Sequence, residues 1–203
     1  MNMPPFHYQP LVAFRGSRDY IHSTDIYEEI INGAALANLG FEGPIDLRIR
    51  TKITCRPRYI FLPAGTLVED AAATCAFNSG GSSYIAAITE TAEVVTDRKT
   101  YDDSSAATAS IIDGRSARLI GETDLRPVEA VTALAVHLHK TALPPTTDQR
   151  WMEVQMSIHR PFIEADTSTL ALHIDRIVGG TMTRTRIEAI DGPLGTMMFI
   201  LAS

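Results

Sequence analysis

His22 and Glu129 are the two side chains of this sequence best suited to acid–base chemistry. His22 comes just ahead of an expected helix, where a neutral imidazole could take a proton alpha to a carbonyl group or activate water. Glu129 lies near the start of a second expected helix made mostly of apolar residues, where burial would raise the pKa of its carboxyl group. The plainer alternatives are a loop histidine bonded to backbone and an exposed glutamate near the helix dipole.

Asp25 is a third catalytic candidate, and Thr24 beside it is a candidate for binding a substrate. The Thr24-Asp25 pair recurs as Thr123-Asp124, and aspartate is favoured at the N-cap of a helix. Helix initiation therefore explains the repetition more simply than catalysis does.

Backbone N–H groups offer another way to bind a developing negative charge, because the N-terminus of a helix can polarise a carbonyl oxygen. Gly80-Gly81 could supply a similar donor to a substrate, although a chain turn is the simpler interpretation. The sequence contains no Gly-x-Ser-x-Gly, phosphate-loop or dinucleotide-binding motif. We therefore set aside serine-hydrolase, nucleotide-binding and dinucleotide-binding functions.

We expect neither a metal nor a cofactor. His137 and His139 are two residues apart, so on a helix they point in different directions, whereas a helical pair of metal ligands needs a spacing near four. Adding His159 gives no recognisable ligand set.

The composition is that of a soluble globular protein of 203 residues, with 45% apolar and 21% charged residues. The formal net charge is −6 and there is no basic patch, so we expect no nucleic-acid partner. No apolar stretch is long enough to cross a membrane, and residues 1–6 lack the features of a secretory signal. Cys55 and Cys75 are expected to be reduced and buried, which favours a cytoplasmic location.

The hydrophobic pattern predicts two helices. The first spans residues 25–39, with Asp25 as N-cap, Glu28 completing a capping box and Gly40 ending the helix. The second spans residues 124–143 and tolerates Pro127 in its first turn. Alternating or apolar segments predict strands at residues 11–14, 44–55, 71–77, 84–95, 106–112, 151–159, 170–178, 182–190 and 196–202.

Two stretches of the sequence echo one another. Residues 20–26 resemble residues 119–125 at an offset of 99, and Arg56-Pro57 recurs as Arg160-Pro161 at an offset of 104. The five extra residues of the second copy are expected in the loop 143–148.

The echo predicts an internal duplication. We expect an extended arm over residues 1–10, then repeats over residues 11–105 and 106–203 that form one compact pseudo-dimeric unit. At the offset of 99, His22 faces Gly121 and Ile30 faces Glu129, so the two acid–base candidates fall in different repeats.

A buried helix followed by antiparallel strands, present twice, resembles the double hot-dog superfamily. This α+β fold wraps a curved sheet around each of two central helices. Residues 126–130 are similar to the second half of polyketide-synthase dehydratase domains, where a proline precedes a helix that bears the catalytic carboxylate. Phe14-Arg15-Gly16 loosely resembles the first half of those domains, but Val12 stands where the family has a histidine.

The resemblance implies an enzyme that acts on acyl thioesters of coenzyme A or acyl carrier protein, at the seam between the two repeats. In a dehydratase or isomerase, His22 would be the base and Glu129 the acid. In a thioesterase, Glu129 or Asp25 would activate water or attack the carbonyl group. A third possibility is a non-catalytic protein that binds an acyl ligand or a partner. A homodimer is compatible with all three of these functions.

Overall fold

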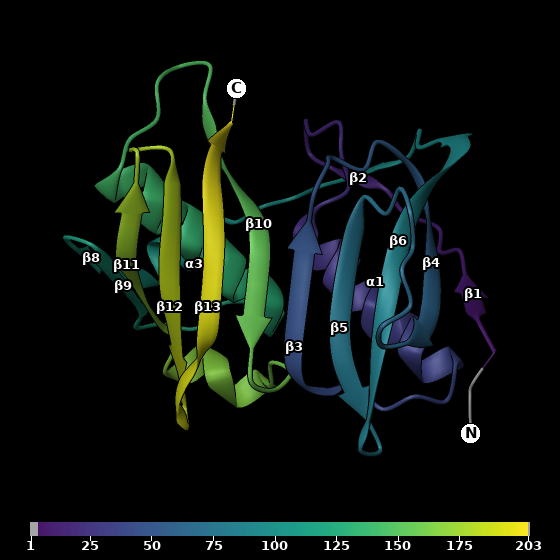
Figure 1. Cartoon of the computed structure of the whole chain (residues 1–203). Helices are drawn as coiled ribbons and strands as arrows, with labels where there is room; N and C mark the ends of the chain where they lie inside the picture. The colour runs from purple at the N-terminus through teal and green to yellow at the C-terminus, as the bar shows by residue number, and fades with distance from the viewer. Residues whose placement is uncertain (1–3, 203) are drawn as a thin grey trace. The chain divides into compact units, whose positions relative to one another are not determined.

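The computed structural model describes residues 4–202. The chain divides into two compact units with the boundary between Tyr101 and Asp102, and we call them unit 1 and unit 2. Each unit has one long helix packed along one face of a curved antiparallel sheet (Figure 1). This architecture confirms the predicted α+β class, with two copies of a helix wrapped by a sheet.

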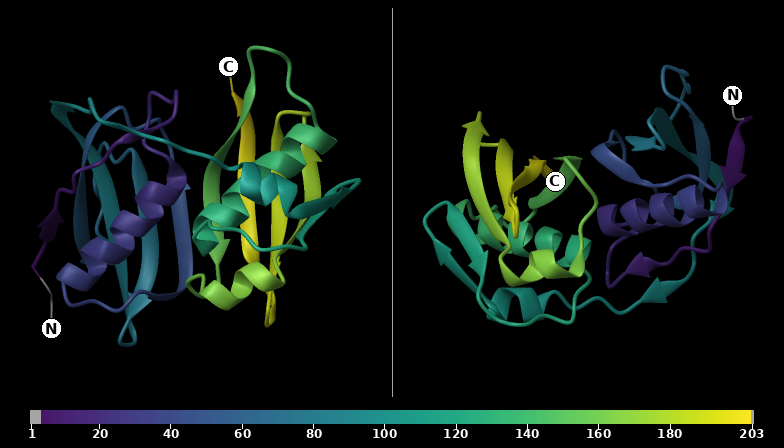
Figure 2. Two further views of the ribbon diagram at one scale, coloured as in Figure 1. Left: turned by 180° about the vertical axis from the view of Figure 1, so that it is seen from behind. Right: turned by 90° about the horizontal axis from the view of Figure 1, so that it is seen from below.

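In unit 1, the helix α1 lies along one face of a sheet with the strand order β1-β4-β6-β5-β3 (Figure 2). A separate parallel pair, β2 and β7, holds the chain ahead of α1 beside the chain that follows β6. The elements are β1 (Phe6–Tyr8), β2 (Phe14–Arg15), α1 (Ser23–Leu36), β3 (Glu42–Ile49), β4 (Cys55–Pro63), β5 (Ala73–Ser79), β6 (Ser82–Val94) and β7 (Arg98–Lys99).

In unit 2, the helix α3 packs on a sheet with the order β10-β13-β12-β11-β9-β8. The elements are α2 (Ser104–Thr108), β8 (Ser110–Asp113), β9 (Ser116–Leu119), α3 (Pro127–Ala142), β10 (Arg150–Ile158), the short 3-10 helix η1 (Glu164–Ser168), β11 (Ala171–Val178), β12 (Met182–Ala189) and β13 (Gly192–Ala202). The expected boundary between residues 105 and 106 falls inside α2.

The two units share an architecture but differ in strand order. In unit 1 the strand after the helix, β3, pairs with β5, and β6 lies between β5 and β4. In unit 2 the corresponding strand, β10, pairs with β13, and β11, β12 and β13 follow one another in space as they do along the chain.

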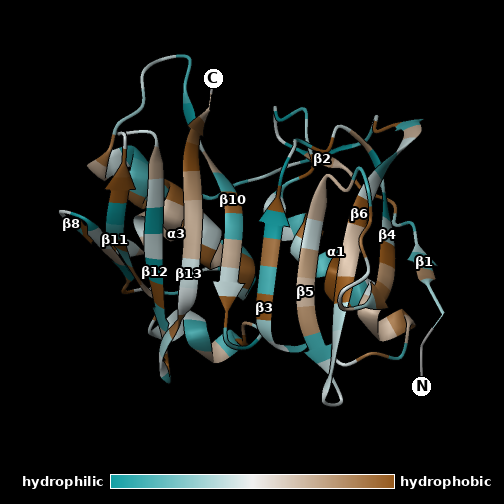
Figure 3. Cartoon of the chain, in the orientation of Figure 1, coloured by the Kyte–Doolittle hydropathy of each residue, from teal (hydrophilic) through white to brown (hydrophobic). Residues whose placement is uncertain are grey.

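The core of each unit lies between its helix and its sheet. On α1, Ile26, Ile30 and Ala34 recur at the spacing that places side chains on one helical face, and all three are buried. Along β12, buried and exposed residues alternate. Hydrophilic and hydrophobic residues also change places along this strand (Figure 3). Among the described residues, no helix is both long enough and apolar enough to span a membrane.

Both helices begin at residues other than those predicted. The N–H of Ile26 bonds the carbonyl oxygen of His22, so His22 rather than Asp25 is the N-cap of α1, and the helix ends at Leu36 before Gly40 is reached. Helix α3 begins at Pro127 rather than at residue 124, and this proline does occupy the first helical position as predicted. Asp25 fails as a cap because its carboxylate is occupied by cations from elsewhere in unit 1.

Three strand predictions also need correction. Of the expected strand at residues 11–14, only Phe14 lies in a strand, β2. The expected strand at residues 44–55 ends early, at Ile49, and β4, which begins at Cys55, was not predicted. Within β4, Pro57, Tyr59 and Phe61 are buried in alternation, a signal that the flanking prolines and arginines obscured. The expected strand at residues 106–112 is instead the end of α2 followed by β8.

The sequence echoes do not mark equivalent positions. Thr24 and Asp25 lie inside the first turn of α1, whereas Thr123 and Asp124 precede α3. Arg56-Pro57 opens β4, whereas Arg160-Pro161 follows β10. When the helices are aligned by their first residues, Ser23 corresponds to Pro127 at an offset of 104 (127 minus 23), and Asp25 corresponds to Glu129. The extra residues therefore do not all lie in the loop 143–148.

The polar side chain of His139 lies fully buried in the core of unit 2. A carbonyl oxygen can only accept, so Nδ1–H donates to Ala135 O at 2.7 Å, and Nε2 accepts from the Thr183 hydroxyl at 2.7 Å. Burial lowers the pKa of His139 to about 4, so the imidazole is neutral at neutral pH.

Gly33 is predicted to be essential to the packing of α1. An added Cβ would come 2.5 Å from Cζ of Phe61 and 2.8 Å from Cδ1 of Tyr8, so Gly33→Ala should lower the free energy of unfolding by about 1–3 kcal/mol despite the better helix propensity of alanine. Chemical denaturation measures the change. The exposed neighbour variant Asn32→Ala should cost little, and equal values for the two variants would contradict the packing argument.

The stability of the protein should fall as the pH drops from about 6.5 to about 4, because the unfolded chain binds a proton at His139 that the folded chain excludes. The depressed pKa corresponds to about 3 kcal/mol across this window. His139→Gln should flatten the slope of unfolding free energy against pH between 5 and 6.5, whatever its effect on stability at neutral pH. Parallel slopes for the variant and the wild type would show that another group dominates.

Candidate functional site

A buried polar cluster occupies the start of α1. His22, Thr24 and Asp25 are 6%, 1% and 7% exposed, so the structure brings three of the predicted site residues together within unit 1. The Nδ1 atom of His22 lies 2.9 Å from the Thr24 hydroxyl and accepts the Thr24 N–H at 3.4 Å. With Nδ1 accepting, the proton of a neutral imidazole resides on Nε2, and His22 is a hydrogen-bond donor through that atom.

Two cations hold the carboxylate of Asp25. Arg15 donates from Nε at 2.7 Å and from Nη2 at 2.5 Å, and Lys99 donates from Nζ at 2.7 Å. Burial alone would raise the pKa of Asp25, but the hydrogen bonds from Arg15 and Lys99 outweigh it and hold the pKa below its usual value. Asp25 is therefore a stably ionised group and a weak base.

The short parallel pair of β2 and β7 positions both cations. In its register Phe14 is opposite Arg98 and Arg15 is opposite Lys99, so the two side chains that reach Asp25 come from adjacent strands. The Tyr101 ring packs beside this cluster, with the guanidinium carbon of Arg15 at 5.1 Å and that of Arg18 at 4.7 Å from its centroid. The His22 and Tyr101 ring centroids are 5.4 Å apart.

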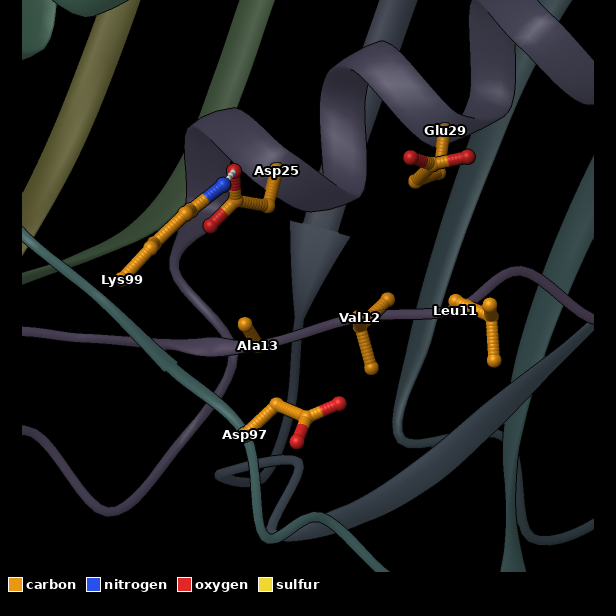
Figure 4. Close-up of a pocket in the computed structure, with 7 residues that line it drawn as sticks. All are labelled: Leu11, Val12, Ala13, Asp25, Glu29, Asp97 and Lys99. Atoms are coloured by element: carbon orange, nitrogen blue, oxygen red, sulfur yellow. Dashed lines mark hydrogen bonds and ion pairs between the residues drawn. The ribbon is translucent and has the colours of Figure 1, made fainter.

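A cavity of about 250 Å³ opens beside this cluster (Figure 4). Its lining combines apolar and charged side chains, namely Leu11, Val12, Ala13, Asp25, Glu29, Asp97 and Lys99. The predicted site residue that lines the cavity is Asp25. Residue 12, where the dehydratase family has a histidine, is part of the same wall.

Glu29 is a cavity residue that sequence reasoning missed. It lies four residues after Asp25, hence on the same face of α1, and accepts a hydrogen bond of 2.6 Å from the Tyr8 hydroxyl. Burial and the bond to Glu29 raise the pKa of Tyr8. The i, i+4 spacing from Asp25 was the available signal, but Tyr8 comes from the separate strand β1 and no sequence pattern links it to Glu29.

Glu129 is in unit 2, at the third residue of α3, the position that Asp25 holds in α1. It is 9% exposed. Its carboxylate accepts from the Arg126 backbone N–H at 3.3 Å and from Nε and Nη2 of Arg126 at 3.1 and 2.9 Å. The central helix of each unit thus begins with a buried carboxylate that an arginine holds.

Gly80 and Gly81 form the tight turn between β5 and β6, with φ of 54° and 78°. Glycine is favoured here because both residues adopt left-handed backbone conformations. The backbone N–H of Gly40, which follows α1, donates to the Ser79 hydroxyl at 2.8 Å. This turn therefore lies near the C-terminal end of α1, whereas His22 lies at its N-terminal end. The structure does not bring these glycines to the His22 cluster.

Within residues 4–202, no group of three or more His, Cys, Asp or Glu side chains is arranged to hold a metal ion.

No protein-family model matches this chain, and no curated protein matches it. Solved structures do. The pyran synthase domain from module nine of the sorangicin pathway has a TM-score of 0.51 at 11% identity, over 98% of this chain and 94% of that domain. An acyl-ACP thioesterase from Bacteroides thetaiotaomicron has a TM-score of 0.48 at 8% identity, over 98% of both chains.

A fusion DH domain has a TM-score of 0.44 at 12% identity, over 90% of this chain and 78% of that one. The similarity to the pyran synthase domain extends over nearly the whole chain and concerns the fold. In its fold, the chain resembles this pyran synthase domain.

Proposed function

We propose that this protein processes acyl thioesters of coenzyme A or acyl carrier protein by acid–base chemistry of the dehydratase or isomerase type. The resemblance to the double hot-dog superfamily, whose enzymes generally use such substrates, supports the substrate class. The observation that carries the proposal is the buried carboxylate at the third residue of each central helix, among backbone N–H groups that can polarise a carbonyl oxygen.

Within this proposal, Glu129 is the group that exchanges a proton with the substrate. Glu129 takes the alpha proton of a 3-hydroxyacyl thioester and then delivers this proton to the 3-hydroxyl group, whose bond to carbon breaks so that water leaves. Glu129 is held by one arginine, whose side chain is 52% exposed, whereas Asp25 is held by two cations, so proton exchange is assigned to Glu129. Asp25, held by Arg15 and Lys99, is assigned a positioning role because proton transfer to it is disfavoured.

His22 is proposed as a hydrogen-bond donor rather than as the base expected from the sequence. Its Nδ1 atom is engaged by Thr24, which orients the ring and leaves the proton on Nε2. A neutral imidazole with this tautomer can stabilise negative charge on a thioester carbonyl oxygen. Thr24 then acts on the substrate indirectly, by holding His22.

Incubation of the protein with panels of 3-hydroxyacyl-CoA and saturated acyl-CoA should produce loss of one water from the 3-hydroxy substrates, observed by mass spectrometry. Glu129→Gln should lower the rate by about 100-fold or more, because the amide can no longer exchange the proton. The exposed variant Glu122→Gln is the matched control and should retain the wild-type rate.

Release of free coenzyme A from either panel would instead indicate a thioesterase. Unchanged panels, with binding of an acyl-CoA still measurable, would leave a non-catalytic acyl-binding protein. Equal rates for Glu129→Gln and Glu122→Gln would remove Glu129 from the chemistry and leave it as a helix cap.

His22→Asn should separate helix capping from chemistry. Asparagine is a strong N-cap residue, so the free energy of unfolding should change by no more than about 0.5–1 kcal/mol, while the rate on 3-hydroxyacyl thioesters falls by about 100-fold with loss of the imidazole N–H. His22→Ala, which removes both functions, should lose stability as well. Full activity in the stable His22→Asn variant would contradict the donor role.

A further inference from the structure

A second cavity, of about 400 Å³, lies within unit 2 and is not used by the chemistry described above. It lies over β8, β9, β11 and β12, and its lining includes Ser116, Arg118, His173 and Arg186. On β9, Ala117 and Leu119 are buried and alternate with Ser116 and Arg118, which therefore point to the sheet face opposite the core.

Strand pairing places a serine beside a histidine in this cavity. Ser116 is directly opposite His173 in the register of β9 and β11, and Ser116 Oγ lies 2.8 Å from His173 Nδ1. The other ring nitrogen, Nε2, lies 4.0 Å from Oδ1 of Asp175. In the tautomer with the proton on Nε2, beside this negative charge, Nδ1 accepts and the Ser116 hydroxyl donates.

The surroundings suit a reaction with a small molecule. The His173 side chain is 43% exposed, so a substrate can reach it, and Arg186 Nη1 lies 3.3 Å from Asp175 Oδ1 and fixes that carboxylate. Arg186 is opposite His173 in the register of β11 and β12. Arg118 lines the same cavity and could stabilise an oxyanion, whereas Arg186 is also paired with Glu188 at 3.2 Å, and Ile111 adds apolar surface.

We propose that Ser116 and His173 form a nucleophile–base pair that hydrolyses small carboxylic esters. Ser116 Oγ attacks the carbonyl carbon as its proton passes to Nδ1 of His173. The bond from carbon to the alcohol oxygen then breaks, the alcohol takes the proton, and an acyl group remains on Ser116. Water attacks this acyl-serine, gives one proton to His173, and releases the acid as Ser116 regains its proton.

Ser116 belongs to no Gly-x-Ser-x-Gly motif, so no sequence motif points to it. His173 is 57 residues away along the chain, and the pairing of β9 with β11 creates the contact. The proposal is independent of the acyl-thioester activity, which Ser116→Ala should leave unchanged.

The test treats the full-length protein with a fluorophosphonate probe, and mass spectrometry then identifies the modified residue. We expect one adduct, on Ser116, formed as fluoride leaves phosphorus. Labelling should be absent in Ser116→Ala and about 100-fold slower in His173→Gln. Hydrolysis of p-nitrophenyl acetate should fall in the same two variants.

Ser110→Ala is the matched control, because Ser110 lies on the adjacent strand β8 with its hydroxyl bonded to the Ala107 carbonyl oxygen. It should label like the wild type. Circular dichroism melting curves establish that each variant is folded. An unmodified Ser116, an adduct on another serine, or equal labelling rates for His173→Gln and the wild type would overturn the proposal.

Discussion

The ion cluster around Asp25 is the interaction on which unit 1 depends most. Arg15 is 2% exposed and Asp25 is 7% exposed, so each would be a buried unpaired charge without the other. Removing one partner of such a pair typically costs about 3–5 kcal/mol. Lys99 completes the cluster from β7, and the same carboxylate therefore joins the segment before α1, the first turn of α1 and the segment after β6. The position of His22 follows from this arrangement, since it caps the helix three residues before Asp25.

The elements of the fold could largely be predicted because their patterns are local. The alternation along β11, β12 and β13 and the apolar face of α1 are visible within short windows of sequence. Where the prediction was wrong, a distant group intervened. Asp25 looks like an N-cap, but Arg15 and Lys99 bind its side chain, and His22 takes over the cap through Nδ1.

The residues of the candidate sites also divide into those that local sequence could predict and those that depend on distant contacts. His22, Thr24 and Asp25 are neighbours in sequence, so their clustering could be expected once a helix was placed after them. The Tyr8–Glu29 and Ser116–His173 contacts join residues from different elements, and they depend on strand register, which a single sequence leaves open. The correspondence of Asp25 with Glu129 was also hidden, because the echoing Thr-Asp pairs lie at different places relative to the two helices.

The difference in strand order between the units has a consequence for how the chain acquires its structure. In unit 2, β11, β12 and β13 form two successive hairpins, so residues 171–202 can assemble through contacts between chain neighbours. In unit 1, β4 pairs with β6 and not with β5, the strand that follows it along the chain. β5 pairs with β3 and β6 instead. The pairing of β4 with β6 therefore closes a longer loop than a hairpin does. Closing loops before contacts form slows folding. The meander of unit 2 is thus built from pairings that close only short loops, and it includes β11 and β12, which carry His173 and Arg186.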